Sequence, residues 1–438
     1  MAAPATVVPR LDPRLAPVLA LLLGLGLPRS FLLLDAVLVA VAWWGWRRPG
    51  PAPSAVVLWS TAWLLVFGVS YAAFQVGWRV WWPPLAHGPQ LLAMLMPAAA
   101  LAAGWLLPRF GRERLSCWLV AYGSGALLYA LLSVALSRTP WWNLAQTFVH
   151  DVRVPWGPQP WMNMRSVEQR AFLALALLPV ALPLRWRPTG PLAPLALPML
   201  VMAALAAHVA WALQGRIGLA VLVVAALPGV WLLPWPVWRR RLACVLAVTA
   251  AVVLGSGRLC DERWWLQLGF LQRLGDAPWG GRLIQFVYRD CRADLVNRFG
   301  AVADATAFSP HNVVLDVYND AGWLPALCLL LALLPVLLLV LQGFWRVLQA
   351  EGWNAELALR WSVLAVLMVQ WLLQPFFYSD QLMCTLGFLL AGALLAEFNP
   401  DTPAGWCSAR PSHPGRSPGG PGGCASPAVA PPSEGQPR

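Results

Sequence analysis

The sequence predicts an all-α polytopic membrane protein. Of its 438 residues, 59% are hydrophobic and only 11% are charged, whereas soluble domains carry about a quarter charged residues. Runs of roughly 20 apolar residues, the length that an α-helix needs to cross a bilayer, recur along the chain. The 28 tryptophans and 41 prolines fit the same class, because indoles collect at membrane interfaces and prolines end or kink helices. A soluble domain is therefore excluded.

About twelve apolar runs qualify as transmembrane helices, since runs shorter than 20 residues are tolerated where helices tilt. In chain order, the predicted spans are residues 15–27, 31–46, 55–77, 90–107, 117–136, 171–184, 191–213, 217–238, 242–256, 322–342, 357–376 and 382–398.

The arginines predict the orientation of these spans. All 31 basic residues are arginine, and basic residues in short loops favour the cytoplasm. With a cytoplasmic N-terminus, the short outer turns hold only Arg29, Arg79 and Arg216. The cytoplasmic turns then hold Arg47, Arg48, Arg109, Arg112, Arg114, Arg185, Arg187, Arg239, Arg240, Arg241, Arg346 and Arg360. Both termini are therefore predicted to be cytoplasmic.

The spans divide the chain into four regions. Residues 1–256 would hold the first nine spans, with a long external loop near 138–170. Residues 257–321 would form a large, helical external loop between spans nine and ten, and residues 322–398 the last three spans. Residues 399–438 are rich in Pro, Gly and Ser with little apolar content, so we expect a disordered cytoplasmic tail.

The end of the large external loop carries the most informative pattern. Ser309 as N-cap and Pro310 as first helical residue predict a short helix that runs into the tenth span. Leu315 and Tyr318 would then share a face with His311. At the external membrane surface, a neutral imidazole at His311 can take a proton from a hydroxyl group. A capping or interfacial histidine is the alternative interpretation.

The spacing of residues 310–312, Pro-His-Asn, and Gly322 resembles a signature of the O-antigen ligases. The related O-antigen polymerases and protein O-oligosaccharyltransferases share it. In this family, a His-Asn pair is followed by nine residues and then by Gly-x-x-Gly. The chain keeps the His-Asn pair, the nine intervening residues and the first glycine, and it has Pro325 at the place of the second glycine.

Two further stretches are similar to the same family. Residues 263–265, Arg-Trp-Trp, and 276–281, Asp-Ala-Pro-Trp-Gly-Gly, resemble its arginine- and tryptophan-bearing helix that ends in a Pro-x-x-Gly turn. Residues 214–218, Gln-Gly-Arg-Ile-Gly, resemble its Ser-Arg-Gly motif, with Gly215 in the place of the serine. The resemblance covers residues 213–331, and the N-terminal half matches only in hydropathy.

The resemblance implies a glycan donor linked to undecaprenyl pyrophosphate. Breaking the sugar–phosphate bond leaves a pyrophosphate, whose growing negative charge must be neutralised in the transition state. A metal ion or paired arginines can do this. The sequence has no Asp-x-Asp and no His/Glu cluster at ligand spacing, which favours arginines. We therefore expect no metal and no cofactor.

Three arginines are candidates for holding the pyrophosphate. Arg216 lies in a very short outer turn, against the inside preference, although snorkelling to the headgroups also explains it. Arg263 is preferred over Arg258, because its spacing to Pro278 fits the family without a gap. A salt bridge within the loop is the alternative role for Arg263. By extrapolation from the family, His311 is the base that activates the acceptor hydroxyl for inverting attack at the anomeric carbon.

Other residues are weaker candidates. Asn312, Tyr318 and His208 are considered as residues that line the site, but helix packing explains Tyr318, and an interhelical hydrogen bond explains His208 equally well. Cys260 and Cys291 share the external loop, where an oxidising compartment would allow a disulfide. The sequence alone does not bring their Cα atoms within bridging distance.

The leading hypothesis is a metal-independent, inverting glycan transferase in the bacterial cytoplasmic (inner) membrane, with a periplasmic active site. Its partners would be the bilayer, the lipid-linked donor and an acceptor, with no nucleic acid. Lipid A core, another lipid-linked glycan and a protein remain alternative acceptors, for a ligase in lipopolysaccharide biosynthesis, a polymerase and a protein transferase respectively. A lipid-linked glycan flippase or transporter is the competing class. Such folds usually show repeated halves and mid-membrane sites, whereas the polar groups here cluster outside the spans.

Overall fold

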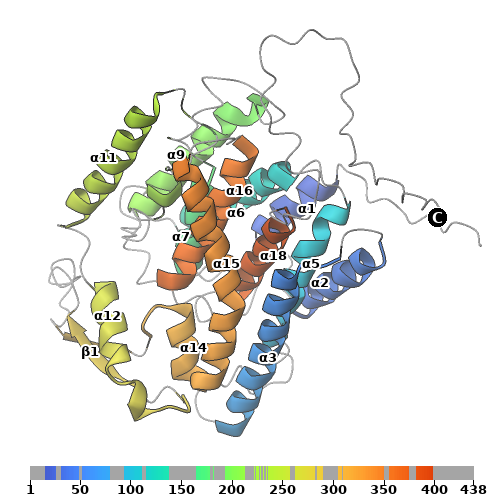
Figure 1. Ribbon diagram of the computed structural model, residues 1–438, viewed down its shortest axis with the longest axis vertical. Helices are drawn as coiled ribbons and strands as arrows, with labels where there is room; N and C mark the ends of the chain where they lie inside the picture. The colour runs from blue at the N-terminus through green and yellow to red at the C-terminus, as the bar shows by residue number, and fades with distance from the viewer. Residues whose placement is uncertain are drawn as a thin grey trace, which may run out of the picture.

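Helices form most of the described chain, and a two-stranded sheet lies beside α12 at the edge of the molecule (Figure 1). This computed structural model describes residues 15–25, 31–48, 52–78, 93–110, 115–137, 164–177, 181, 193–212, 221, 223–225, 227, 230, 233, 235–256, 262–281, 284–289, 304–307, 309–349, 355–373 and 381–397. The predicted tail at 399–438 and most of the loop near 138–170 lie outside these residues.

Helices lie in every predicted span, although half of the eighth span lies outside the described residues. The α-helices are α1 (Leu15–Gly24), α2 (Phe31–Trp46), α3 (Ala55–Trp78), α5 (Met96–Leu106), α6 (Leu115–Ser137), α7 (Met164–Leu175), α9 (Ala196–Ala212), α11 (Val237–Ser256), α12 (Glu262–Leu271), α14 (Val313–Ala321), α15 (Trp323–Gln349), α16 (Ala355–Leu373) and α18 (Gln381–Glu397). Short 3₁₀ helices cover Ala93–Leu95, Leu107–Phe110, Ala193–Leu195 and Leu274–Asp276.

Some helices extend beyond their predicted apolar runs. α2 has the predicted bounds, but α11 begins at Val237 rather than at residue 242 and so includes Arg239, Arg240 and Arg241. Arginine is a good helix former. An apolar run therefore marks the hydrophobic part of a helix and not its ends.

By length and composition, two helices among the described residues are able to cross a membrane. They are α3 over Ala55–Phe74 and α6 over Ser116–Ser133. Several other apolar helices are shorter, among them Met96–Leu106 and Cys384–Ala396. About twelve membrane spans, as expected from run lengths, remain a prediction.

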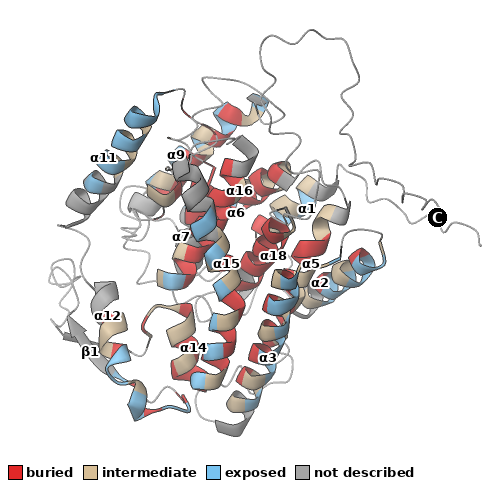
Figure 2. Ribbon diagram, in the orientation of Figure 1, coloured by how far each residue is buried: buried red, intermediate tan, exposed pale blue. Residues whose placement is uncertain are grey.

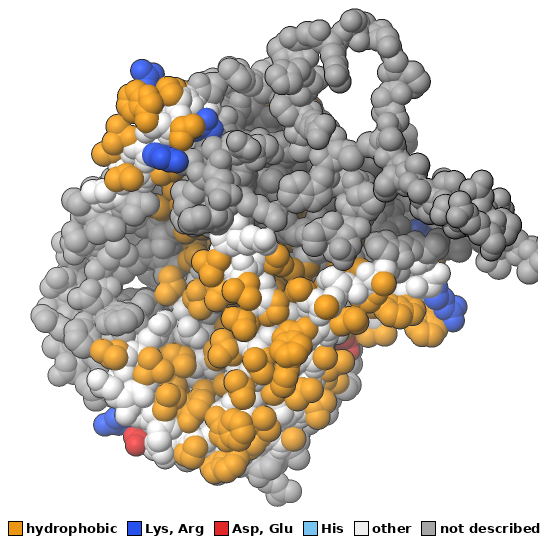
Figure 3. All heavy atoms as spheres, in the orientation of Figure 1, with side chains coloured by type: hydrophobic (Ala, Val, Ile, Leu, Met, Phe, Trp, Pro, Cys, Tyr) orange, Lys and Arg blue, Asp and Glu red, His pale blue; other side chains and the backbone are white. Residues whose placement is uncertain are grey.

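Helix α15 is apolar on two opposite faces. The buried face includes Ala326, Leu329, Leu333 and Val336. The exposed face repeats at helical spacing and consists of Trp323, Leu327, Leu330, Leu334, Leu338 and Leu341. Apolar side chains also gather over the face of the molecule where α3 and α15 lie (Figure 3). Large exposed apolar surfaces are rare on soluble monomers and mark sites of contact with lipid or with another protein.

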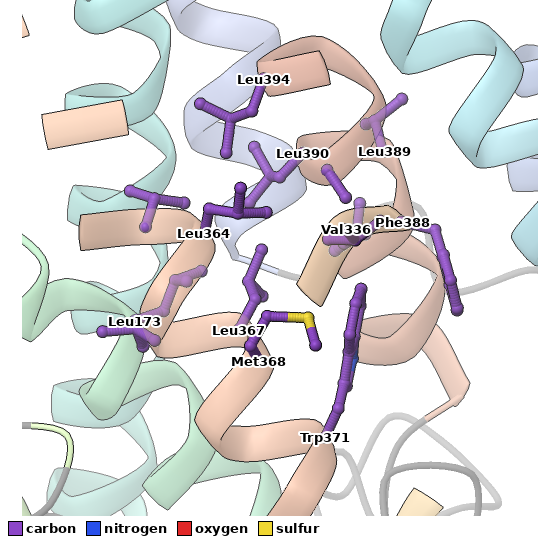
Figure 4. Packing of buried hydrophobic residues seen from close by; sticks show 14 of the residues in the cluster. Leu173, Val336, Leu364, Leu367, Met368, Trp371, Phe388, Leu389, Leu390 and Leu394 are labelled. Carbon is purple, nitrogen blue, oxygen red and sulfur yellow. The ribbon is translucent and has the colours of Figure 1, made fainter. Parts of the chain in front are cut away.

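The core lies where α16 and α18 meet α15 and α7 (Figures 2 and 4). Leu367 and Trp371 of α16 are buried there beside Phe388 of α18, Val336 of α15 and Leu173 of α7. The rings of Trp371 and Phe388 stack with centroids 4.8 Å apart. By contrast, most described side chains of α11 are exposed or half-buried (Figure 2).

Glycines allow α5 and α18 to pack backbone against backbone. A Cβ atom added at Gly104 would clash with the carbonyl oxygen of Leu389, and one added at Gly392 would clash with that of Leu101. Small residues permit such close approach of helices in membranes.

Gly104→Ala is therefore expected to destabilise the protein by about 1–3 kcal/mol, because overpacking forces the two backbones apart. Thermal unfolding of the purified protein in detergent measures the change. Gly275→Ala is the matched control, since a Cβ atom there would have nothing within 4 Å. Equal unfolding temperatures for the two variants would contradict the packing argument.

The external loop was predicted to be helical, and that prediction is wrong in part. α12 and a 3₁₀ turn are helical, but β1 (Phe286–Arg289) pairs antiparallel with β2 (Asp304–Ala307). The register sets Phe286 opposite Ala307 and Arg289 opposite Asp304. The Phe-Val-Tyr sequence of β1 explains the strand, because aromatic and β-branched residues favour extended backbone.

Candidate functional site

The segment that carries His311 lies between β2 and α15. It continues into α14, which ends at Ala321; Gly322, with φ 86°, caps the helix and is followed directly by α15. The predicted helix start is wrong. Asn312 is the N-cap, and Ser309, Pro310 and His311 precede the helix. His311 therefore does not share a helical face with Leu315 and Tyr318.

The backbone of His311 has an unusual conformation. Its φ is 57°, in the left-handed region that non-glycine residues seldom adopt. Its backbone N–H donates to Ser309 Oγ at 3.3 Å, and its ring Nδ1 lies 3.0 Å from the carbonyl oxygen of Ser309. A carbonyl only accepts, so Nδ1 carries the proton in this contact. In the neutral imidazole, the lone pair is then on Nε2, the atom that would act as a base.

Asn312 joins three parts of the structure. Its Oδ1 accepts from the backbone N–H groups of Val314 and Leu315, at 3.0 and 3.3 Å, and so caps α14. Its Nδ2 donates to the carbonyl oxygen of Leu372 near the end of α16, at 3.2 Å. The same oxygen accepts from Gln267 Nε2 of α12, at 3.1 Å. Both ends of the Asn312 amide thus have structural partners, which explains an asparagine beside His311.

Helix α12 packs against α14 and carries the position of Arg263. Leu266 and Phe270 of α12 are buried in a small cluster with Ala277 and Ile284, and Leu315 and Tyr318 pack against that cluster. Position 263 precedes Leu266 by three residues and Gln267 by four, so it belongs to the same side of α12. One helical turn, about 5.4 Å, therefore separates position 263 from the residue that shares an acceptor with Asn312.

The turn at residues 278–281 contacts the C-terminal end of α14. The backbone N–H of Gly281 donates to the carbonyl of Asp320 at 2.9 Å, and that of Trp323 donates to the carbonyl of Pro278 at 3.1 Å. Gly322 has a positive φ, and a Cβ atom there would lie 2.8 Å from the Pro278 oxygen. Two of the stretches that carry the family resemblance, residues 276–281 and the end of 310–322, therefore meet in the fold.

Tyr318 and His208 occupy different surroundings. The Tyr318 hydroxyl donates to the carbonyl of Leu274 at 2.8 Å, and its ring meets Phe270 edge to face, with centroids 6.1 Å apart. Burial raises the pKa of the Tyr318 phenol, which keeps it a donor. His208 is exposed on α9, and Figure 1 shows α9 in the upper half of the molecule and α14 in the lower half. Tyr318 thus holds α12 to α14. His208 lies far from His311 and does not belong to the same site.

Sequence reasoning missed two buried acidic residues on α14, Asp316 and Asp320, which lie close to Asn319 along the helix. Asp316, Asn319 and Asp320 are all at least 96% buried. Asp316 Oδ1 accepts from Ser309 Oγ at 2.7 Å, Asn319 Nδ2 donates to the Ile284 carbonyl at 3.3 Å, and Asp320 Oδ2 accepts from the Tyr71 hydroxyl at 2.9 Å. The sequence did contain a signal for them, because Asp316, Asn319 and Asp320 recur at helical spacing between apolar residues. Acidic residues that are buried in this way need hydrogen-bond partners.

Several predicted site residues lie outside the residues that the structure describes. Arg216, Arg258, Cys260 and Cys291 fall in undescribed segments, and for Arg263 the structure gives only the helical backbone. Within the described residues, no group of three or more His, Cys, Asp or Glu side chains is placed to hold a metal ion.

Asn312→Ala is expected to destabilise the protein by about 1–2 kcal/mol, because it removes the cap of α14 and the bond to Leu372. Asn312→Asp keeps the capping oxygen and loses only the donor, so its loss should be smaller. Thermal unfolding of both variants measures the difference. A larger loss in the Asp variant than in the Ala variant would contradict the capping role.

The chain matches no protein-family model, and no curated protein sequence is significantly similar to it.

Proposed function

We propose that the protein transfers a glycan from undecaprenyl pyrophosphate to an acceptor hydroxyl, as an O-antigen ligase does, at the outer face of the cytoplasmic membrane. The observation that supports this most is the contact between the turn at residues 278–281 and α14. Segments that resemble separate motifs of one family are thereby neighbours in space. The exposed apolar faces of α3 and α15 support a membrane location.

In the proposed reaction, the acceptor oxygen attacks the anomeric carbon of the donor sugar. His311 Nε2 takes the proton of the acceptor hydroxyl as the new glycosidic bond forms. The bond between the anomeric carbon and the phosphate oxygen breaks, and its electron pair leaves with undecaprenyl pyrophosphate. Attack opposite the leaving group inverts the anomeric configuration. The protonated Nδ1 of His311, held by the Ser309 carbonyl, is consistent with this role.

Arg216 and Arg263 are proposed to neutralise the pyrophosphate, with Arg258 as the second choice in the external loop. Guanidinium groups form paired, charge-assisted hydrogen bonds with phosphate oxygens. Position 263 is supported by its place on α12, on the side of the helix that includes Leu266 and Gln267. A salt bridge within the loop remains the competing role for Arg263.

Deletion of the gene, followed by electrophoresis of the surface polysaccharide, tests the function and identifies the acceptor. Loss of every polymer-bearing lipopolysaccharide band, with accumulation of lipid-linked polymer, supports the ligase. Lipopolysaccharide capped by a single repeat indicates a polymerase, and a shifted glycoprotein with unchanged lipopolysaccharide indicates a protein transferase. Accumulation of the donor on the cytoplasmic side of the membrane would indicate a flippase and contradict the proposal.

Transfer by the purified protein is expected to be unchanged after treatment with a chelator of divalent cations, because arginines are proposed to supply the positive charge. A radiolabelled donor and an acceptor, with and without chelator, give the measurement. Loss of transfer in chelator, with recovery on addition of a divalent cation, would contradict the arginine mechanism.

A further inference from the structure

A short chain of hydrogen bonds surrounds the backbone of His311. The His311 N–H donates to Ser309 Oγ at 3.3 Å, and Ser309 Oγ donates to Asp316 Oδ1 at 2.7 Å. The Ser309 hydroxyl therefore acts as acceptor and donor at once. Since neighbouring hydrogen bonds polarise one another, each contact strengthens the other.

Asp316 fixes the far end of this chain. Its side chain is 1% exposed, and it belongs to the first turn of α14. Negative charge is favourable there, because the backbone N–H groups at a helix N-terminus point toward it. Its backbone N–H also donates to the Asn312 carbonyl at 2.8 Å. Asp316 is thus fixed in the first turn of the helix, and its carboxylate, through Ser309, holds the segment before the helix.

Because the backbone of His311 is left-handed, these hydrogen bonds also decide how its imidazole ring is held. A residue with φ of 57° relaxes toward ordinary values unless its surroundings hold it. Two contacts do so, the bond from its N–H to Ser309 Oγ and the bond from Nδ1 to the Ser309 carbonyl. Pro310, which separates Ser309 from His311 in the sequence and is buried, restricts the backbone further.

We propose that Ser309 and Asp316 are positioning residues that hold His311 in the left-handed conformation and thereby fix its imidazole as the Nδ1-protonated tautomer. Ser309 acts through both its hydroxyl and its carbonyl, and Asp316 acts through the Ser309 hydroxyl. The tautomer follows from the geometry, whereas its effect on transfer rests on the proposed function. In that reaction, the pair keeps the basic lone pair on Nε2.

The first test reads the tautomer directly. Selective ¹⁵N labelling of the five histidines, with His311→Gln to assign the signal, distinguishes protonated from unprotonated ring nitrogens. The wild-type protein should show Nδ1–H at His311 at a pH where the ring is neutral. Ser309→Ala should give a mixture of tautomers, and Ser309→Thr, which keeps a hydroxyl, should restore the wild-type signal. An Nε2–H signal in the wild type, or an unchanged signal in Ser309→Ala, would overturn the proposal.

The second pair of variants separates the hydrogen bond from the carboxylate charge. Asp316→Asn keeps an oxygen that accepts from Ser309 Oγ, and Asp316→Leu has a similar size without an acceptor. We expect the Nδ1–H signal to persist in the Asn variant and to be lost in the Leu variant. Loss in both variants would assign the effect to charge, and persistence in both would remove Asp316 from the mechanism.

Kinetics then connect the tautomer to transfer. Ser309→Ala should lower kcat by about tenfold, less than removal of a general base costs, while KM for the donor stays unchanged. Ser309→Thr should recover kcat. An equal fall in kcat in the Ala and Thr variants would contradict the positioning role. If the wild-type protein transfers no glycan, the proposed function fails, and the ¹⁵N signals alone decide the role of Ser309 and Asp316.

Discussion

Replacing His311 with alanine is expected to lower the rate of glycan transfer by about 10²- to 10⁴-fold, the usual contribution of a general base. The protein should still accumulate in the membrane, because the cap of α14 is formed by Asn312 rather than by His311. Transfer from a labelled lipid-linked donor, normalised to the amount of purified protein, measures the loss.

His208→Ala is the matched control for that experiment. His208 is exposed on α9, which lies apart from α14 (Figure 1). This variant should transfer glycan at the wild-type rate. Full activity in His311→Ala would remove His311 from the chemistry, and equal losses in the two variants would point to a general effect on folding.

Arg263→Ala is expected to lower kcat for transfer by about 10²- to 10³-fold, the usual loss when a donor to a developing negative charge is removed. The charge grows on the pyrophosphate only as the bond breaks, so kcat should fall more than the affinity for the donor. Arg263→Lys should keep part of the activity, because an amine supplies charge without the paired geometry of a guanidinium group.

Arg273→Ala is the control on the same loop segment. Arg273 is exposed, and its Nη1 donates to the carbonyl of Gln285 at 2.6 Å. Its loss should lower stability slightly and leave transfer intact. If Arg263→Ala transferred at the wild-type rate while Arg273→Ala did not, the assignment of Arg263 would be wrong.

The helices themselves were largely predictable from the sequence. α2 has the predicted bounds and α3 ends one residue beyond them. Such runs are easy to recognise because a helix that faces both lipid and a buried core is apolar all round, as α15 is. The ends were harder to predict, because α11 continues as a helix through residues 239–241.

The geometry around His311 was not predictable from local patterns. Pro310 suggested a helix start, but Asn312 caps the helix instead, and the left-handed backbone of His311 lies outside it. The partner of Asp320 is Tyr71, which is 249 residues away in the sequence. The hairpin was missed because β2 has the sequence Asp-Ala-Thr-Ala, which lacks the alternating apolar pattern of a strand.

The contacts of α14 suggest why the site would be rigid. Tyr71 joins α14 to α3, Tyr318 joins it to the segment after α12, and Asn312 joins it to α16. Phe74 of α3 also stacks on Trp279, with ring centroids 6.2 Å apart. A catalytic group benefits from such support, because small displacements at a reacting centre reduce rates strongly.

The most direct test is a reaction with purified protein, a lipid-linked glycan donor and a hydroxyl acceptor. We expect one undecaprenyl pyrophosphate to be released for each new glycosidic bond, with inversion at the anomeric carbon and with loss of both products in His311→Ala. Unaltered donor that crosses the bilayer of a vesicle, without release of undecaprenyl pyrophosphate, would contradict glycan transfer and indicate a flippase.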